Sequence, residues 1–228
     1  MQINQYIDHT LLKPTALIKD IETLCSEALQ YNFAAVCVPP PMVKIAKAQL
    51  QNSKVKVATV IGFPFGYSAV EAKIAEIILA VIDGVDELDI VINLIALKNS
   101  DWQYLANEIN HIVPVAKQNP AAGNKVIKII IETGVLTNEE IIRCCELYGA
   151  ADIDFVKTST GFAKEGAKLE QVKLMRSVVP DSVGVKASGG IQSYLQAKEF
   201  IEAGADRIGT SSGVKIVSQS IQEHVGNI

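Results

Sequence analysis

The stretch IDFVKTSTGFAKEGAKLEQVKLMRSVVPDSVGVKASGG, residues 153–190, contains the repeating unit that decides the fold. It begins and ends with short segments rich in β-branched residues, Ile153 to Lys157 and Val183 to Lys186. Between them, apolar residues recur at helical spacing, at Val172, Met175 and Val179. This order of strand, helix and strand is typical of two parallel strands joined by a helical crossover.

The same unit recurs along the whole chain. Eight segments are predicted as strands: Tyr6 to Thr10, Ala34 to Val38, Val55 to Ile61, Glu87 to Ile92, Val126 to Ile131, Ile153 to Lys157, Val183 to Lys186 and Arg207 to Thr210. Eight strands alternating with helices predict an α/β fold, a closed (β/α)8 or TIM barrel. The chain shows no linker or composition break, so we expect one domain over residues 1–228. An open doubly wound sheet is the main alternative, but the GxGxxG and GxxxxGK[ST] phosphate motifs of such sheets are missing.

Three helix-to-strand junctions resemble one another. Gly84, Gly149 and Gly204 each stand a few residues before a predicted strand, in DGVDELDI, YGAADIDF and AGADRIG. A glycine in this place suits the left-handed conformation that ends many helices. We therefore expect all three to end a helix in this way.

Composition limits the classes of function. The 228 residues are 49% hydrophobic and 20% charged, a balance that fits a globular protein. A net charge of −4 gives no support to nucleic acid as a partner. No apolar run approaches the roughly 20 residues needed to span a bilayer, and the first residues lack the features of a signal peptide. We expect no membrane association and a cytoplasmic location.

Cysteine and histidine patterns do not predict a metal site. The four cysteines, Cys25, Cys37, Cys144 and Cys145, lack metal-site spacing and are expected to be reduced thiols. The three histidines are scattered, without an HExxH-like group. We therefore expect no protein-bound catalytic metal.

Two lysines end predicted strands, Lys157 in DFVKTSTG and Lys186 in VGVKASGG. Removing an ammonium from water costs several kcal/mol of solvation. A second ammonium nearby raises that cost, yet it is also a way to keep a lysine neutral and nucleophilic near neutral pH. The pair therefore indicates Schiff-base chemistry. The alternative is a buried lysine stem whose head reaches solvent or a carboxylate.

Further polar residues fall on the same predicted strands. Side chains alternate along a strand, so Asp89 and Asn93 share one face, as do Lys128 and Glu132. If both faces point into the barrel, Asp89 and Lys128 can pair. Four successive strands then carry Asp89, Lys128, Lys157 and Lys186. These strands offer too few carboxylates to pair with three lysines that have only a structural role. This favours a function for the lysines.

Glycine-rich loops follow the last two predicted strands. They are Ser188-Gly189-Gly190 and Gly209-Thr-Ser211-Ser212-Gly213. Barrels commonly bind phosphate at this position, with backbone N–H groups and the positive end of a helix. We expect mainly neutral donors there, and hence phosphate affinity that depends only mildly on salt.

Motifs along nearly the whole chain resemble class I deoxyribose-phosphate aldolases. They are IDHTLLKP with Asp8, AVCV with Cys37, VIGFP with Gly62, ELDIVIN with Asp89, DFVKTSTGF with Lys157, VKASGGI with Lys186 and RIGTSSG with Gly209. The resemblance implies that Lys157 forms the Schiff base and that Lys186 lowers its proton affinity. It also implies that Asp89 relays protons with Asp8, Lys128 and a water. The substrate and its phosphate are expected to contact Cys37, Thr158, Thr160, Gly161, Gly189, Gly190, Gly209, Ser211 and Ser212.

The expected reaction is reversible cleavage of 2-deoxy-D-ribose 5-phosphate to D-glyceraldehyde 3-phosphate and acetaldehyde, without metal or organic cofactor. The expected partners are small sugar phosphates and aldehydes, with a homodimer as a possible assembly. The alternatives are another Schiff-base barrel aldolase or transaldolase, or a sugar-phosphate sensor without activity.

The chain also departs from the family pattern at Pro39, Ile95 and Gln192, which affects loop shape and phosphate affinity. It lacks the carboxyl-terminal tyrosine of some members, so we expect no tail over the site.

Overall fold

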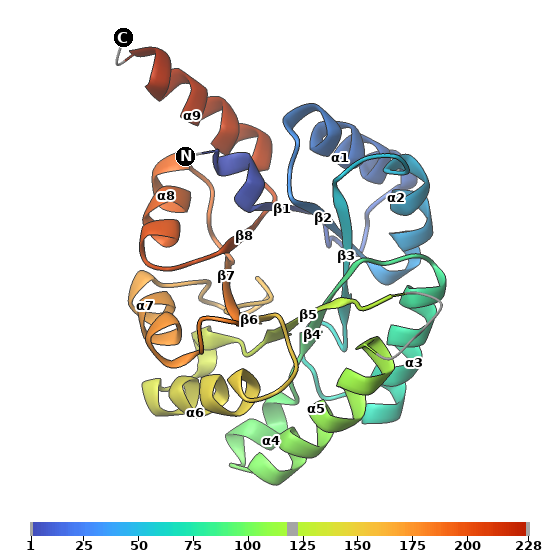
Figure 1. Ribbon diagram of the computed structural model, residues 1–228, viewed down its shortest axis with the longest axis vertical. Helices are drawn as coiled ribbons and strands as arrows, with labels where there is room; N and C mark the ends of the chain where they lie inside the picture. The colour runs from blue at the N-terminus through green and yellow to red at the C-terminus, as the bar shows by residue number, and fades with distance from the viewer. Residues whose placement is uncertain (1, 118–122, 227–228) are drawn as a thin grey trace.

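A computed structural model describes residues 2–117 and 123–226. Its centre is a closed barrel of eight parallel strands in chain order, in which β1 pairs with both β2 and β8 (Figure 1). The strands are β1 (Ile7–Thr10), β2 (Ala35–Val38), β3 (Lys56–Ile61), β4 (Glu87–Val91), β5 (Val126–Ile130), β6 (Phe155–Lys157), β7 (Gly184–Ser188) and β8 (Arg207–Thr210). The predicted (β/α)8 barrel is confirmed. The predicted strand boundaries differ from these by at most two residues.

Helices surround the barrel, as Figure 1 shows. They are α1 (Ile18–Tyr31), α2 (Val43–Gln49), α3 (Val70–Ile82), α4 (Leu94–Lys98), α5 (Trp102–Lys117), α6 (Asn138–Gly149), α7 (Leu169–Val178), α8 (Tyr194–Glu202) and α9 (Gly213–Gly226). Short 3-10 helices are η1 (Ile3–Tyr6), η2 (Pro40–Met42) and η3 (Thr133–Val135). Within the described ranges, no helix is both long and apolar enough to cross a membrane.

Apolar residues fill the layer between barrel and helices. Each helix turns an apolar face toward the strands. In α7, for example, the buried residues are Val172 and Met175, one turn apart. Strand residues such as Val156 and Val185 are fully buried on the same outer side. A much smaller apolar cluster of Cys37, Ala58 and Val60 forms separately from this layer. The barrel interior therefore has little apolar filling beside its charged residues.

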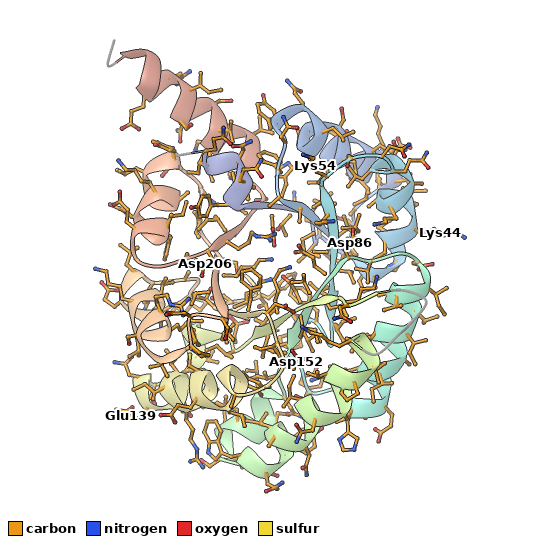
Figure 2. The ribbon with its side chains drawn as sticks, in the orientation of Figure 1. Lys44, Lys54, Asp86, Glu139, Asp152 and Asp206 are labelled. Atoms are coloured by element: carbon orange, nitrogen blue, oxygen red, sulfur yellow. The ribbon has the colours of Figure 1, made fainter. Side chains whose placement is uncertain are left out.

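The repeated junctions ahead of β4, β6 and β8 each carry an aspartate with the same hydrogen-bonding role. Asp86, Asp154 and Asp206 each accept a hydrogen bond from the backbone N–H of a neighbouring strand, those of Val57, Ile127 and Val185. Asp86 and Asp206 are labelled in Figure 2. Such a carboxylate satisfies an N–H at the amino end of the sheet, where no strand residue can accept it.

The glycines of these junctions do not all behave as predicted. Gly84 and Gly204 have φ of +93° and +105°, the left-handed conformation expected after a helix. The prediction is wrong for Gly149, which is the last residue of α6 and is followed by the right-handed Ala150. A Cβ at Gly149 would lie 2.9 Å from Cδ of Pro180, so close packing, rather than φ, requires glycine there.

Candidate active site

Parallel strand register brings the predicted residues together inside the barrel. Asp89 is directly opposite Lys128, and Lys157 is opposite Lys186, because β4 pairs with β5 and β6 with β7. Gly209 lies opposite Asp8 on β1. A Cβ at Gly209 would lie 3.2 Å from Cε of Lys186 and 2.9 Å from Cβ of Ser188. Gly209 therefore leaves space for the Lys186 side chain, and its contact with phosphate stays a prediction.

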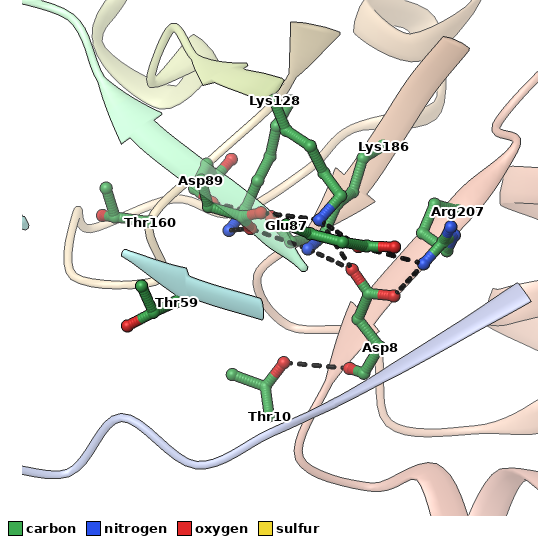
Figure 3. Close-up of polar contacts among 12 residues, drawn as sticks. Asp8, Thr10, Thr59, Glu87, Asp89, Lys128, Thr160, Lys186 and Arg207 are labelled. Carbon is green, nitrogen blue, oxygen red and sulfur yellow. Dashed lines mark hydrogen bonds and ion pairs between the residues drawn. The ribbon is translucent and has the colours of Figure 1, made fainter. Parts of the chain in front are cut away.

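Asp89 is the centre of the cluster, which Figure 3 shows in close-up. Its Oδ1 lies 2.8 Å from Nζ of Lys128, and its Oδ2 lies 2.7 Å from Nζ of both Lys157 and Lys186. Asp8 adds a second carboxylate, with Oδ2 at 2.5 Å from Nζ of Lys186. The predicted pairing of Asp89 with Lys128 is confirmed. The amines of Lys157 and Lys186 both contact carboxylates, which is also what the alternative of a structural role for the two lysines predicts.

Two charged residues of this cluster were missed. Glu87 Oε2 lies 2.5 Å from Nζ of Lys128, and Arg207 Nη1 lies 2.6 Å from Oδ1 of Asp8. Glu87 precedes Asp89 by two residues, so strand alternation could have placed it inward. Arg207 begins β8, and its sequence context gives no comparable signal. The expectation of too few carboxylates was therefore partly wrong, because Asp8 and Glu87 add to Asp89.

Burial and charge act in opposite directions on the carboxylates. Burial alone would raise the pKa of Asp89, but the charges of Lys128, Lys157 and Lys186 hold it well below its usual range. Burial likewise would raise the pKa of Asp8, and Arg207, Lys186 and Lys128 outweigh that effect and lower it. Both groups are therefore carboxylates at neutral pH.

The two strand-end lysines differ in their preferred charge. Burial lowers the pKa of Lys157, and the positive charge of Lys186 lowers it further, against the opposing effect of Asp89. The pKa of Lys186 is raised, because Asp8 and Asp89 together outweigh its burial. Lys157 is thus the lysine that loses its proton more readily, which is the property required of an amine nucleophile.

Lys157 reaches a cavity of about 450 Å³ at the carboxyl ends of the strands. One part of its lining comes from glycine-rich backbone at or after the ends of β6, β7 and β8, namely Gly161, Gly189, Gly190, Gly209 and Ser211. Leu11, Leu12 and Phe162 supply an apolar part, and Lys13 a cation. Active sites of (β/α)8 barrels lie at this end of the strands. Lys157 is only 3% exposed, so a ligand in the cavity would meet its amine away from bulk water.

Three predicted contact residues do not line this cavity. Cys37 is fully buried in the small apolar cluster, and burial followed by the charge of Asp89 raises its pKa to about 11. Thr158 joins β6 to β7, since its hydroxyl donates to the carbonyl of Ser188 and accepts from the Ser188 N–H. The N–H of Ser212 donates to the hydroxyl of Thr210. These three residues support the site without facing the cavity.

Glu132 and Asn93 lie past their strands and outside the charged cluster. Glu132 has φ of +59°, and its carboxylate accepts hydrogen bonds from the N–H and the hydroxyl of Thr160. Asn93 caps α4 by accepting from the N–H of Ala96. The prediction that each of them shares a face with Asp89 or Lys128 therefore fails, because the alternation of side chains holds only within a strand. Thr160 lines the cavity, so Glu132 fixes part of the cavity wall.

The three departures from the family pattern have different positions. Gln192 lines the cavity, Pro39 precedes η2, and Ile95 is 59% exposed in α4.

The predicted absence of a closing tail concerns residues that include 227–228, which lie outside the described part of the chain. Among the described residues, no group of three His, Cys, Asp or Glu side chains is placed to hold a metal ion.

The family model that describes the DeoC/LacD family aldolases matches residues 3–219 of the sequence. The chain belongs to this family. The deoxyribose-phosphate aldolase of Thermococcus kodakarensis is 54% identical over 224 residues, which cover 97% of this chain and 98% of that protein. The deoxyribose-phosphate aldolase of Thermococcus gammatolerans is 55% identical over 219 residues, covering 95% and 96%.

Solved structures of family members agree with this assignment. The deoxyribose phosphate aldolase of Aeropyrum pernix, described as tetrameric, is 33% identical and has a TM-score of 0.88. The match covers 97% of this chain and 92% of that one. The resemblance predicted from the motifs is thus confirmed at the level of family and fold.

Proposed function

We propose that this member of the DeoC/LacD aldolases reversibly cleaves 2-deoxy-D-ribose 5-phosphate to D-glyceraldehyde 3-phosphate and acetaldehyde. The observation that carries the proposal is the lysine pair on one carboxylate. Lys157 faces the cavity, and Lys186 faces away from it, toward Asp8, while both contact Oδ2 of Asp89. Small sugar phosphates and aldehydes are the corresponding ligands. A homodimer stays a prediction.

The chemistry follows from the protonation of these groups. The neutral amine of Lys157 adds to the C1 aldehyde of the sugar and, with loss of water, forms an iminium. A base removes the proton of the C3 hydroxyl, the C2–C3 bond breaks, and its electrons form an enamine while glyceraldehyde 3-phosphate leaves. A proton then reaches the enamine carbon, and water releases acetaldehyde and the amine. The iminium makes the carbanion step easier by accepting its electrons.

We assign the proton transfer at the enamine carbon to Asp89, with a water, and we assign Asp8 and Lys128 to its support. Asp89 is the carboxylate in direct contact with Lys157, which places it beside the reacting carbon. Lys186 holds the positive charge that keeps Lys157 neutral. These assignments match the roles implied by the family motifs.

The overall reaction is tested by incubating the protein with 2-deoxy-D-ribose 5-phosphate and measuring both products. We expect equimolar glyceraldehyde 3-phosphate and acetaldehyde. Turnover of another sugar phosphate in place of this one would favour a different Schiff-base aldolase or transaldolase. Saturable binding of deoxyribose 5-phosphate without products would favour a sensor.

Lys186→Leu should move the acid limb of the pH–rate profile to higher pH and lower the rate. Activity needs neutral Lys157 and falls as pH drops through its pKa. Removing the neighbouring positive charge raises that pKa, so protonation begins at higher pH. Measuring kcat/KM against pH checks the shift. An acid limb at the wild-type position would remove the electrostatic role of Lys186.

Ser211→Asp should raise KM for deoxyribose 5-phosphate by about tenfold or more, while KM for unphosphorylated deoxyribose changes little. Ser211 lines the cavity beside Gly189 and Gly190, where we place the phosphate, and a carboxylate would repel the dianion. Ser211→Asn is the neutral control of similar size. Equal losses on both substrates would show that the phosphate binds elsewhere.

Lys13 changes the expected salt dependence. It is an exposed cation on the lining of the same cavity, so phosphate there meets a charge as well as neutral donors. Attraction between exposed charges weakens with ionic strength. The expectation that phosphate affinity depends only mildly on salt therefore left out the attraction between phosphate and Lys13.

A further inference from the structure

The charged cluster continues past the proposed catalytic residues to the opposite end of the barrel. Glu87 lies 2.5 Å from Nζ of Lys128, and its carboxylate also lies 3.4 Å from Nη1 of Arg207. Arg207 in turn contacts Asp8 at 2.6 Å. Figure 3 shows these contacts joining Glu87 and Arg207 to the groups around Asp89. One connected network therefore runs from Lys157 to Arg207.

The charges of this network balance only when Lys157 is neutral. Asp8, Glu87 and Asp89 supply three negative charges, and Lys128, Lys186 and Arg207 supply three positive charges. Protonating Lys157 adds an uncompensated positive charge inside the barrel. The side chains of Asp8, Asp89, Lys128 and Lys186 are 0% exposed, so water screens them poorly.

We propose that Glu87 and Arg207 are positioning residues that set this charge balance and thereby adjust the proton affinity of Lys157, with Arg207 lowering it and Glu87 raising it. The inference rests on the proposed function, in which Lys157 is the nucleophile, and deepens it. Neither Glu87 nor Arg207 contacts Lys157 directly, so each acts through the groups that lie between it and Lys157. Arg207 acts through Asp8 and Lys186, and Glu87 acts through Lys128 and Asp89.

Other groups also face Lys157. Asp89 on β4 and Lys186 on β7 are the nearest charges, and the Cys37 thiol on β2 acts weakly. Glu132, at the end of β5, interacts with Lys157 but is hydrogen bonded to Thr160, and Lys13 lies on the cavity lining. None of these residues is altered in the comparison below. A change seen on altering Glu87 or Arg207 therefore reports the balance of the network.

The two residues carry opposite charges, so they make opposite predictions. Glu87→Gln leaves an excess positive charge and should disfavour protonated Lys157. Arg207→Met leaves an excess negative charge and should favour it. A purely structural role for either residue would not give shifts of opposite sign.

The test is the pH dependence of Lys157 acetylation by acetic anhydride, followed by peptide mapping. Only the neutral amine reacts, so the midpoint of labelling reports its protonation without any turnover. We expect Glu87→Gln to lower the midpoint, and Arg207→Met to raise it, each by about one pH unit. Arg207→Lys keeps the charge and should stay close to the wild type. The double variant Glu87→Gln/Arg207→Met should also return toward the wild-type midpoint.

Lys54→Gln is the matched control. Lys54, labelled in Figure 2, is exposed and lines a second cavity together with Arg207, at the amino ends of the strands. It should leave the midpoint unchanged. If Arg207→Met does not fold, Glu87→Gln and Arg207→Lys still decide the question.

Unchanged midpoints in both single variants, or shifts of the same sign, would overturn the proposal. Failure of the proposed function is a separate result. In that case wild-type protein would not cleave deoxyribose 5-phosphate, although the opposite shifts in acetylation of Lys157 would still be found and would support the charge balance.

Discussion

Lys157→Leu is expected to lower turnover of deoxyribose 5-phosphate by at least about 10⁴-fold, because Lys157 is the buried amine of lowered pKa that faces the cavity. Lys128 and Lys186 are fully buried behind Asp89, and Lys157 is the lysine of this group that lines the cavity. Steady-state kinetics on the purified variant measures the loss.

The fold should survive this substitution. Leucine replaces a buried amine, and Asp89 keeps its contacts to Lys128 and Lys186. We expect a circular dichroism spectrum and Tm like those of the wild type. Lys173→Leu, at an exposed site in α7, is the control for removing one lysine charge and should retain full activity. Near-normal turnover by Lys157→Leu would rule out its role as nucleophile.

Asp89→Asn is expected to slow exchange of the acetaldehyde methyl protons with solvent by about 10²–10⁴-fold, the usual range for losing a general acid–base group. Asparagine keeps the shape of the side chain but cannot take up the proton. Proton NMR of acetaldehyde in deuterated buffer measures the exchange rate.

Iminium formation provides the control for this variant. Because Lys157 remains, Asp89→Asn should still be labelled by acetaldehyde and borohydride, although exchange is slow. Exchange at the wild-type rate would instead make Asp89 a structural partner of the three lysines.

The fold could be predicted from the sequence because each strand and helix has its own local signal. The β-branched segments and the helical spacing of Val172 and Met175 specify the order of elements, and eight repeats specify closure. Strand ends were less certain. The start of β6 at Phe155, two residues later than predicted, depends on pairing with Lys128 of β5. Pairing between strands is not visible in a single segment.

The candidate site was predictable where motif and strand alternation agreed, as for Asp89, Lys128, Lys157 and Lys186. Arg207 was missed because its contact with Asp8 joins residues 199 positions apart in the chain. Gly149 was misread because its constraint is the contact with Pro180, which depends on how α6 packs. Residues whose roles depend on such distant contacts need the three-dimensional structure.

Borohydride trapping with acetaldehyde, followed by peptide mapping, tests the central claim most directly. Borohydride reduces an iminium to a stable secondary amine, so the label marks the lysine that forms it. The account predicts one two-carbon adduct per chain, on Lys157, and none in Lys157→Leu. A label on Lys186 or Lys128, or no label on protein that cleaves deoxyribose 5-phosphate, would contradict it.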